Sequence, residues 1–251
     1  MDKLQADIKA IAHGLGLLNP SGLSYTSCRD IYRNQKSRGN KAYTLQTDVG
    51  KVPVYCHMTS IEGCGGGGWT LVMKIDGHKS NFHYDSDYWT SKTEFNRRGG
   101  QTGFDFDETK LPTYWNTPFS QICVGMKIGH QIKFTRISVN ANSLYSLIAD
   151  GHYRATSLGR NTWKSLIGSQ ASLQTNCNKE GFNVAGEEPS HAKARIGILG
   201  NNENDCYSCD SRIGFGTGGK YDDTNTCGNE AIHSADNGDK HMKAMGYILV
   251  Q

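Results

Sequence analysis

Eight cysteines spread along the whole chain constrain most strongly what this sequence can fold into. They stand at positions 28, 56, 64, 123, 177, 206, 209 and 227 of 251 residues. An even number of cysteines in a glycine-rich, loop-rich chain favours disulfides and therefore an oxidising, extracellular compartment. A cytosolic protein with free thiols or a zinc site is the alternative. The residues after Met1 do not have the basic and then apolar pattern of a signal peptide, so secretion implies a leader that has been removed.

Charge and hydropathy exclude two classes of partner. Lys and Arg number 27 against 24 Asp and Glu, a formal net charge of +3, and we expect no nucleic-acid partner because no basic face is indicated. A membrane-spanning helix needs about 20 consecutive apolar residues, whereas the apolar runs here are only a few residues long. Twelve Tyr, eight Phe and four Trp supply bulky material for a core, so the chain is expected to fold.

Residues 1–22 differ from the rest. Apolar side chains recur there at alternating spacings of four and three, the a and d positions of a heptad repeat, at Leu4, Ile8, Ile11, Leu15 and Leu18. This pattern predicts a helical leader with a turn-forming linker, followed by one domain over residues 23–251. The leader either lies on its own domain or is the end of an oligomerising stalk, in which case the chain forms a homo-oligomer.

Short β-like runs separated by glycine and asparagine dominate the remainder. The best predicted strands are 51–56, 69–75, 132–139 and 247–250, and the predicted short helices are 91–98 and 143–149. Strands and helices do not alternate strictly, so an α+β fold is favoured over a doubly wound sheet. Four glycines, Gly65 to Gly68, precede the strand at Trp69 and predict tight turning and close backbone packing; no Gly-Lys-Ser/Thr follows, which excludes a phosphate loop.

The segment 201–239 holds eight of the chain's 24 acidic residues, and only Arg212 and Lys220 oppose them. We expect a disulfide-stapled region of surface loops. Calcium takes six to eight oxygen ligands from flexible loops, and dense carboxylates would be relieved by a divalent cation. The candidate ligands are Asp222 and Asp223 with Asn225, Asn229 and Glu230, and a second set of Glu203, Asp205 and Asp210. A solvated acidic loop without metal is the alternative.

Cys206 and Cys209 form a Cys-x-x-Cys pair. Thioredoxin-like chemistry needs this motif at a helix start within a βαβ unit, which is not predicted here, and a zinc site would need two further close ligands. Two structural disulfides, one from each of these cysteines, are therefore expected. The sequence contains neither Gly-x-Ser-x-Gly nor His-Glu-x-x-His, so we do not expect an enzyme.

Several motifs together resemble the opening of a fibrinogen C-terminal-like domain. They are Ser27-Cys28-Arg29-Asp30, Tyr55-Cys56-His57-Met58, Gly66-Gly-Gly-Trp69-Thr70-Leu71-Val72 and Tyr84-Asp85-Ser86-Asp87-Tyr88-Trp89-Thr90. In that family two cysteines just under thirty residues apart form a disulfide before the Gly-Gly-Gly-Trp-Thr strand, so the resemblance implies a Cys28–Cys56 bond. The other six cysteines allow 15 arrangements.

The carboxyl-terminal half is more similar to the intelectins. The similarity lies in Asn201-Asn202-Glu203, in the glycine run and acids over 216–223, and in Cys227-Gly228-Asn229. The Trp-Trp pair of fibrinogen and the Glu-His-His-Cys motif of intelectins are missing, and Asn229 stands where intelectins have an acid. These departures make the fold better supported than any ligand.

The resemblance implies an α+β domain with mixed, largely antiparallel sheets, short helices and a loop-rich, disulfide-stapled carboxyl-terminal region. It implies a secreted, calcium-dependent, lectin-like module for recognition or innate defence, which binds glycans or other extracellular ligands. The expected ligand-binding side chains are Tyr207, Phe215, Tyr221 and His233. The alternative is a protein-binding or extracellular-matrix structural module without a sugar site, favoured by the missing histidine and acid.

Overall fold

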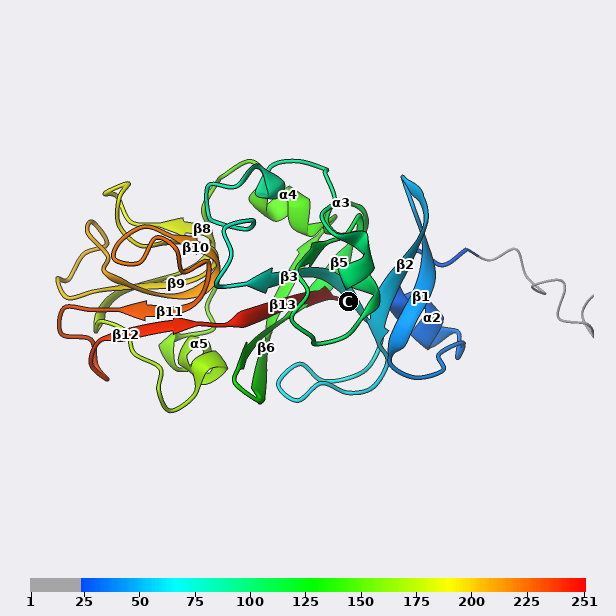
Figure 1. Cartoon of the computed structure of the whole chain (residues 1–251), viewed down its shortest axis with the longest axis horizontal. Helices are drawn as coiled ribbons and strands as arrows, with labels where there is room; N and C mark the ends of the chain where they lie inside the picture. Colours follow the sequence, from blue (N-terminus) through cyan, green and yellow to red (C-terminus); the bar gives the residue numbers. More distant parts are fainter. Residues whose placement is uncertain (1–23) are drawn as a thin grey trace, which may run out of the picture.

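Two antiparallel sheets lie side by side in the computed structural model, which describes residues 24–251 (Figure 1). The helical leader predicted over 1–22 lies outside the described residues. The α+β class with antiparallel sheets, short helices and disulfides is confirmed. The six-stranded sheet is formed by consecutive strands, whereas the seven-stranded sheet also pairs segments far apart in the sequence.

The seven-stranded sheet contains all four strands predicted from the sequence. In spatial order it consists of β1 (Lys41–Thr47), β2 (Gly50–His57), β3 (Trp69–Asp76), β13 (Met245–Val250), β5 (Phe119–Ile128) and β6 (Gln131–Ala141), with β4 (Thr109–Lys110) paired to β3. The carboxyl-terminal strand β13 therefore lies in the middle of this sheet, hydrogen-bonded to β3 on one side and β5 on the other.

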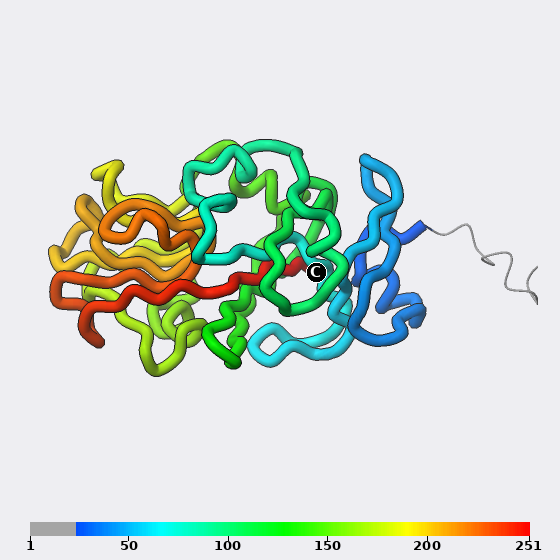
Figure 2. The backbone as a smooth tube through the Cα atoms, viewed as in Figure 1, coloured from blue at the N-terminus to red at the C-terminus, as the bar shows by residue number. Residues whose placement is uncertain are grey.

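The six-stranded sheet contains two strands from the acidic segment. In spatial order it consists of β12 (Lys240–Lys243), β11 (Cys227–Ala231), β10 (Ser211–Gly218), β9 (Lys193–Asn201), β8 (Asn176–Ala185) and β7 (Arg154–Ala155). The chain passes from β12 in this sheet directly into β13 in the other, which joins the two sheets (Figure 2). At the crossing the Ala244 amide donates to Cys227 O at 2.8 Å, and the Gly77 amide donates to Ala244 O at 2.9 Å.

The helices are short and cover the edges and faces of the sheets. They are α2 (Cys28–Arg33), α3 (Thr113–Asn116), α4 (Leu144–Ile148) and α5 (Arg160–Ile167), with 3-10 turns η1 (Asp87–Trp89) and η2 (Arg97–Gln101). The helix predicted over 143–149 is confirmed as α4, which begins with a capping box at Ser143. The helix predicted over 91–98 is wrong. Phe95 instead forms a β-bridge with Lys110, and Asn96 takes a left-handed conformation at φ 44°.

The main core fills the space where the two sheets meet α4 and α5. Its largest side chains, among them Trp89, Trp163 and Phe215, are fully buried. A second core beneath β1 and β2 includes four of the disulfide-bonded cysteines. Since aromatic side chains bury the most apolar area per residue, these rings compensate for the low apolar content of the chain.

Three disulfides connect parts of the described chain. Cys28–Cys56 joins α2 to β2, as the resemblance implied, and Cys64–Cys123 joins the loop before β3 to β5. Cys177–Cys206 fastens the start of β8 to the loop 202–210. The expectation of a second disulfide from the Cys-x-x-Cys pair is wrong.

Within residues 24–251, Cys209 and Cys227 form no disulfide. The Cys209 side chain packs with Val184, Leu199 and neighbouring alanines, and Cys227 belongs to the main core. Both thiols are therefore buried rather than exposed to solvent.

The glycine run before β3 is structural, as predicted. A side chain at Gly67 would place its Cβ 1.9 Å from the Met58 carbonyl oxygen, and Gly68 has φ +94°. Only glycine accommodates both the close approach and the left-handed conformation.

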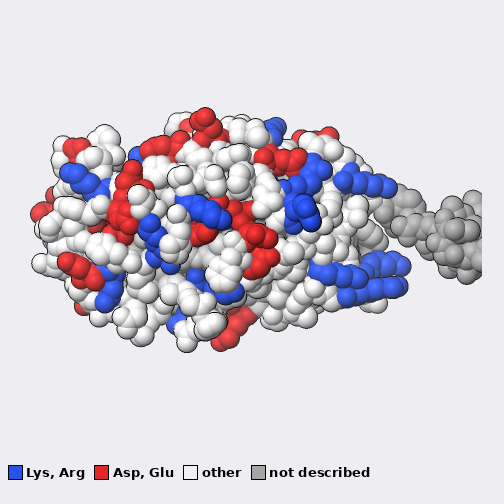
Figure 3. Space-filling view, viewed as in Figure 1, with Lys and Arg blue, Asp and Glu red and all other residues white. Residues whose placement is uncertain are grey.

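Basic side chains gather at one end of the molecule. In Figure 3 they cluster at the right-hand end, over α2, β1 and β2, whereas acidic and basic side chains intermix elsewhere on the visible face. Residues 24–60 contain six Lys and Arg but only two Asp. None of the helices in the described part of the chain is long and apolar enough to cross a membrane.

Candidate functional site

The acidic segment 201–239 is not a surface region throughout. Its residues in β10 and β11 are all buried, and only the loops 202–210, 219–226 and 232–239 reach the surface. The expectation of a purely surface segment is therefore wrong. Glycines at alternate positions of β10 leave room for covering side chains: a Cβ at Gly216 would lie 2.3 Å from the Trp89 ring, and one at Gly218 would lie 2.6 Å from the His83 ring.

Asn229 and Glu230 face the interior. The Asn229 amide oxygen accepts from the Ser172 amide at 2.8 Å, and its nitrogen donates to Ser172 O and Arg212 O. The Glu230 carboxylate has no exposed surface and contacts His241 and Asn225. Burial raises the pKa of Glu230, and its neighbours lower it by less. These two predicted metal ligands hold strands together.

Asp222 and Asp223 turn to different neighbours. Asp222 accepts from the backbone amide of Thr224 at 2.9 Å and lies 3.7 Å from Lys243 Nζ. Asp223 accepts from the Gly219 amide at 2.5 Å and contacts His83 Nε2 at 2.8 Å. Burial alone would raise the pKa of each carboxyl, but these hydrogen bonds and cations outweigh it and lower both pKa values.

The residues of the second predicted ligand set also lie in different surroundings. Glu203 and Asp205 are exposed on the loop 202–210, where Asp205 accepts from the Tyr207 amide at 2.8 Å. Asp210 is buried and lies 3.4 Å from Gln174 Nε2 and 3.7 Å from His191 Nε2. In the range 24–251, no three His, Cys, Asp or Glu side chains are grouped so that they could hold a metal ion. Within this range, therefore, the three carboxylates of neither predicted set are grouped as a metal site would need.

Arg212 supplies a buried positive charge within the acidic segment. Its guanidinium is fully buried beneath the loop 219–226 and donates to Lys220 O at 2.7 Å and to Asp222 O at 2.6 Å, with further contacts to Gly219 O and Asn225 O. Burial lowers its pKa to about 10, so it remains charged at neutral pH. The positive charge that gathers these carbonyl oxygens is thus covalently part of the chain.

At the surface the structure brings two of the predicted ligand-binding residues, Tyr221 and His233, into contact, and it connects exposed Tyr207 to Lys220 through the loop 186–191. We call exposed Tyr207, Tyr221 and His233, together with the buried Asp210, the recognition patch. Tyr221 is 47% exposed and Tyr207 53% exposed. Tyr221 Oη lies 2.6 Å from His233 Nε2, and the two rings meet edge to face with centroids 4.9 Å apart.

Two connections fix the geometry of the recognition patch. Gln174 Nε2 donates to His233 O at 3.1 Å and to Asp210, which ties the two together. The loop 186–191 lies between the tyrosines: Tyr207 O accepts from the Glu188 amide and the Lys220 amide donates to Ser190 O. Burial and the Asp210 carboxylate raise the pKa of Tyr221, so its hydroxyl is protonated at neutral pH.

Phe215 is placed differently from the prediction. It lies in β10 with no exposed surface and belongs to the main core. Its side chain points to the interior, where a sugar cannot reach it. The prediction of Phe215 as a ligand-facing ring is wrong, because short spacing from Tyr221 in the sequence does not reveal which face of a strand a residue occupies.

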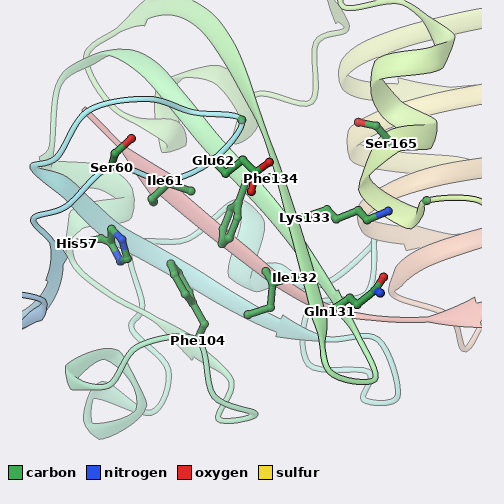
Figure 4. Close-up of a pocket in the computed structure, with 12 residues that line it drawn as sticks. His57, Ser60, Ile61, Glu62, Phe104, Gln131, Ile132, Lys133, Phe134 and Ser165 are labelled. Carbon is green, nitrogen blue, oxygen red and sulfur yellow. The ribbon is translucent and has the colours of Figure 1, made fainter.

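A cleft of about 1010 Å³ lies on another part of the surface, beside the edge strand β6 (Figure 4). Phe104 and Phe134 form its aromatic floor with ring centroids 4.9 Å apart, and His57 stacks on Phe104 at 5.3 Å. Glu62 and Lys133 supply opposite charges at the rim. Burial lowers the pKa of His57, which favours the neutral ring.

No motif in the sequence indicates this cleft. Its lining comes from the segment 57–63, from Phe104, from β6 and from the vicinity of α5. Since these segments meet only in the tertiary structure, no local motif could have revealed it.

Fold and site together define an α+β domain of the extracellular, disulfide-stapled kind, with a polar and aromatic surface patch suited to binding. No family model matches the chain. Over 72 residues, 27% of this chain, it is 46% identical to the fibrinogen beta chain of Petromyzon marinus. The match spans 13% of that protein's length. The similarity supports a fibrinogen-like domain, whereas these comparisons lend no support to the intelectin resemblance.

Proposed function

We propose that this chain is an extracellular recognition module that binds carbohydrate at the recognition patch. The observation that carries the proposal is the exposed Tyr221 ring, whose hydroxyl is hydrogen-bonded to His233 beside the Asp210 carboxylate. A sugar offers an apolar C–H face and a set of hydroxyls, so it suits an aromatic ring bordered by oriented polar groups. Binding makes and breaks no covalent bond, and fibrinogen-like domains are not typically enzymes.

The described residues indicate how a ligand would be held. Tyr221 and Tyr207 offer ring faces, while the Tyr221 hydroxyl and the His233 imidazole donate or accept hydrogen bonds close to the buried Asp210 carboxylate. Gln174 and Arg212 fix these groups from beneath. Since the patch is held before the ligand arrives, little ordering is needed on binding. Residues 1–22 would add affinity through multivalency if they join copies of the chain.

Calcium dependence stays a prediction within this proposal. Among the described residues, the carboxylates of neither predicted set are grouped, and Arg212 already gathers the carbonyl oxygens of the loop 219–226. Exposed carboxylates remain at Glu203 and Asp205 on the loop that also carries Tyr207. Binding through the ring and the polar groups described above uses no metal, so a chelator distinguishes the two possibilities.

A protein-binding role is the second candidate function, and the cleft beside β6 favours it. An aromatic floor with opposite charges at the rim matches the composition of protein-binding surfaces, which are rich in aromatic residues at the centre and polar at the edge. In that case the chain would keep the fold without a sugar site.

A glycan array separates these functions. The labelled protein is applied with calcium and with a chelator, and compared with Tyr221→Ala and with Tyr153→Ala, a matched control because Tyr153 is similarly exposed at 43%. We expect Tyr221→Ala to weaken binding by about tenfold or more, as loss of an aromatic anchor does, and Tyr153→Ala to leave it unchanged. An empty array, or binding that survives Tyr221→Ala, would refute the proposed patch.

A further inference from the structure

Three sulfur atoms meet where the start of β8 approaches the loop 202–210. Cys177 and Cys206 form a disulfide, and Cys209 Sγ lies 3.7 Å from Cys177 Sγ. Thiol–disulfide exchange proceeds by attack of a thiolate on one sulfur of a disulfide. A third sulfur in contact with a disulfide sulfur has the proximity that this reaction requires.

The backbone at Cys177 leaves its side chain outside the regular strand pairing. β8 and β9 pair at Asn176 and again at Lys179, and the register shifts between them. Cys177 and Asn178, the two residues of this bulge, are both left-handed, with φ +65° and +52°. A bulge redirects a side chain without a ladder partner to constrain it. Cys177 is therefore held by its sulfur bond more than by the sheet.

We propose that Cys177 exchanges its disulfide partner between Cys206 and Cys209, and that the second form presents Cys206 as a site of mixed-disulfide formation. The Cys209 thiolate attacks Cys177 Sγ, the Cys177–Cys209 bond forms, and the Cys177–Cys206 bond breaks. The electron pair leaves on Cys206, which takes up the proton that Cys209 lost. No external oxidant or reductant is consumed in this step.

The exchange changes which thiol can be reached from solvent. Cys209 is buried with no exposed surface, whereas Cys206 is half-buried on the loop, beside exposed Tyr207. The released Cys206 thiolate can attack the disulfide of a small extracellular disulfide compound, forming a mixed disulfide and expelling one thiol. The fold thus converts an inaccessible thiol into an accessible one.

The surroundings of Cys209 make the exchange slow rather than absent. Burial raises the pKa of its thiol to about 12; Lys179 lowers it, and Asp210 and Asp205 raise it further. A small thiolate fraction at neutral pH limits the rate of attack. Proximity compensates in part, because the reaction is intramolecular.

The test uses the whole chain and glutathione disulfide as the probe, followed by non-reducing peptide mapping in a mass spectrometer. We expect a glutathione adduct on Cys206 together with a Cys177–Cys209 linked peptide. Cys227, which is fully buried in the core, is the internal control and should stay unmodified. An adduct on Cys209 with an intact Cys177–Cys206 bond, or no adduct on either cysteine, would overturn the proposal.

Two cysteine variants test the exchange further, and the readout of the second does not depend on whether glutathione can reach a thiol. Cys209→Ala removes the attacking sulfur and should abolish the adduct on Cys206. Cys206→Ser leaves Cys177 with Cys209 as its neighbour, so we expect a Cys177–Cys209 disulfide and alkylation of one thiol, Cys227, in denaturant. Alkylation of three thiols would mean that Cys177 cannot pair with Cys209, and the exchange would be disproved.

Discussion

Lys110 in β4 is a fully buried lysine, and its surroundings make the stability of the domain depend on pH. Its Nζ donates to Ser91 O at 2.6 Å and lies over the rings of Tyr114, Tyr88 and Trp115, at 4.6, 5.8 and 5.5 Å from their centroids. No salt bridge among the described residues involves it. Burial lowers its pKa from 10.5 to about 7.

The sign of the effect follows from the two pKa values. Between pH 7 and 10.5 the unfolded chain binds a proton at Lys110 that the folded chain has released. The free energy of unfolding therefore rises with pH across this window. From these pKa values the Lys110 contribution rises by about 2 kcal/mol between pH 7 and pH 9.

Lys110→Met isolates this contribution, because methionine fills a similar volume and does not titrate. Urea unfolding is followed by tryptophan fluorescence at pH 7, 8 and 9. Both chains carry Cys209→Ala and Cys227→Ala, so that no free thiol reshuffles disulfides at high pH. We expect the stability of the lysine chain, relative to Lys110→Met, to rise by about 2 kcal/mol over this range.

Lys51→Met is the matched control, because it makes the same substitution at an exposed lysine of β2. If the difference between the lysine chain and Lys110→Met does not change with pH, the buried ammonium keeps its ordinary pKa. The reasoning from burial would then be refuted.

Two further predictions concern the backbone and a buried carboxylate. Gly67→Ala should destabilise the domain by about 1 to 3 kcal/mol, because its Cβ would lie 1.9 Å from Met58 O. Gly66→Ala is the control, since a Cβ at Gly66 has open space around it. Thermal unfolding should show a lower Tm for Gly67→Ala only. The Glu180 carboxylate accepts hydrogen bonds from Trp163 Nε1 at 2.8 Å and from backbone amides. Burial raises the pKa of Glu180, but these hydrogen bonds outweigh burial and lower it. Glu180→Gln should therefore lower the free energy of unfolding by about 2 kcal/mol at pH 7. That cost should shrink as the pH falls through the folded pKa below 4.5, and equal losses at pH 7 and pH 3 in urea unfolding would contradict the assignment.

The strands were predictable where side chains alone determine them. The run from Trp69 to Ile75 is apolar, β-branched or aromatic almost throughout, and it lies in the central strand β3. The segment 91–98 was not predictable, since its composition suits a helix but Phe95 pairs with a strand 15 residues later. Tertiary pairing overrides a local preference that is worth only fractions of a kcal/mol per residue.

The candidate site was predictable in part. Tyrosine and histidine within the acidic segment pointed to Tyr221 and His233, which the structure brings into contact. Arg212 could not have been identified, because an arginine in a polar stretch is ordinarily exposed, and its full burial depends on carbonyl groups that converge only in the fold. Gln174 likewise reaches the patch from a distant segment.

The position of β13 has a consequence for the order of folding. Until β13 is inserted, β3 and β5 have no neighbour on their inner sides. The contacts that close the gap join residues about 175 positions apart on the β3 side, such as Ile248 and Met73, and about 120 positions apart on the β5 side, such as Ile248 and Val124. Closing so long a loop is slow, and unpaired strand borders invite association between chains in the meantime. We therefore expect refolding to be most vulnerable to aggregation before β13 pairs with β3 and β5. High dilution should then improve the recovery of folded protein more than a longer refolding time.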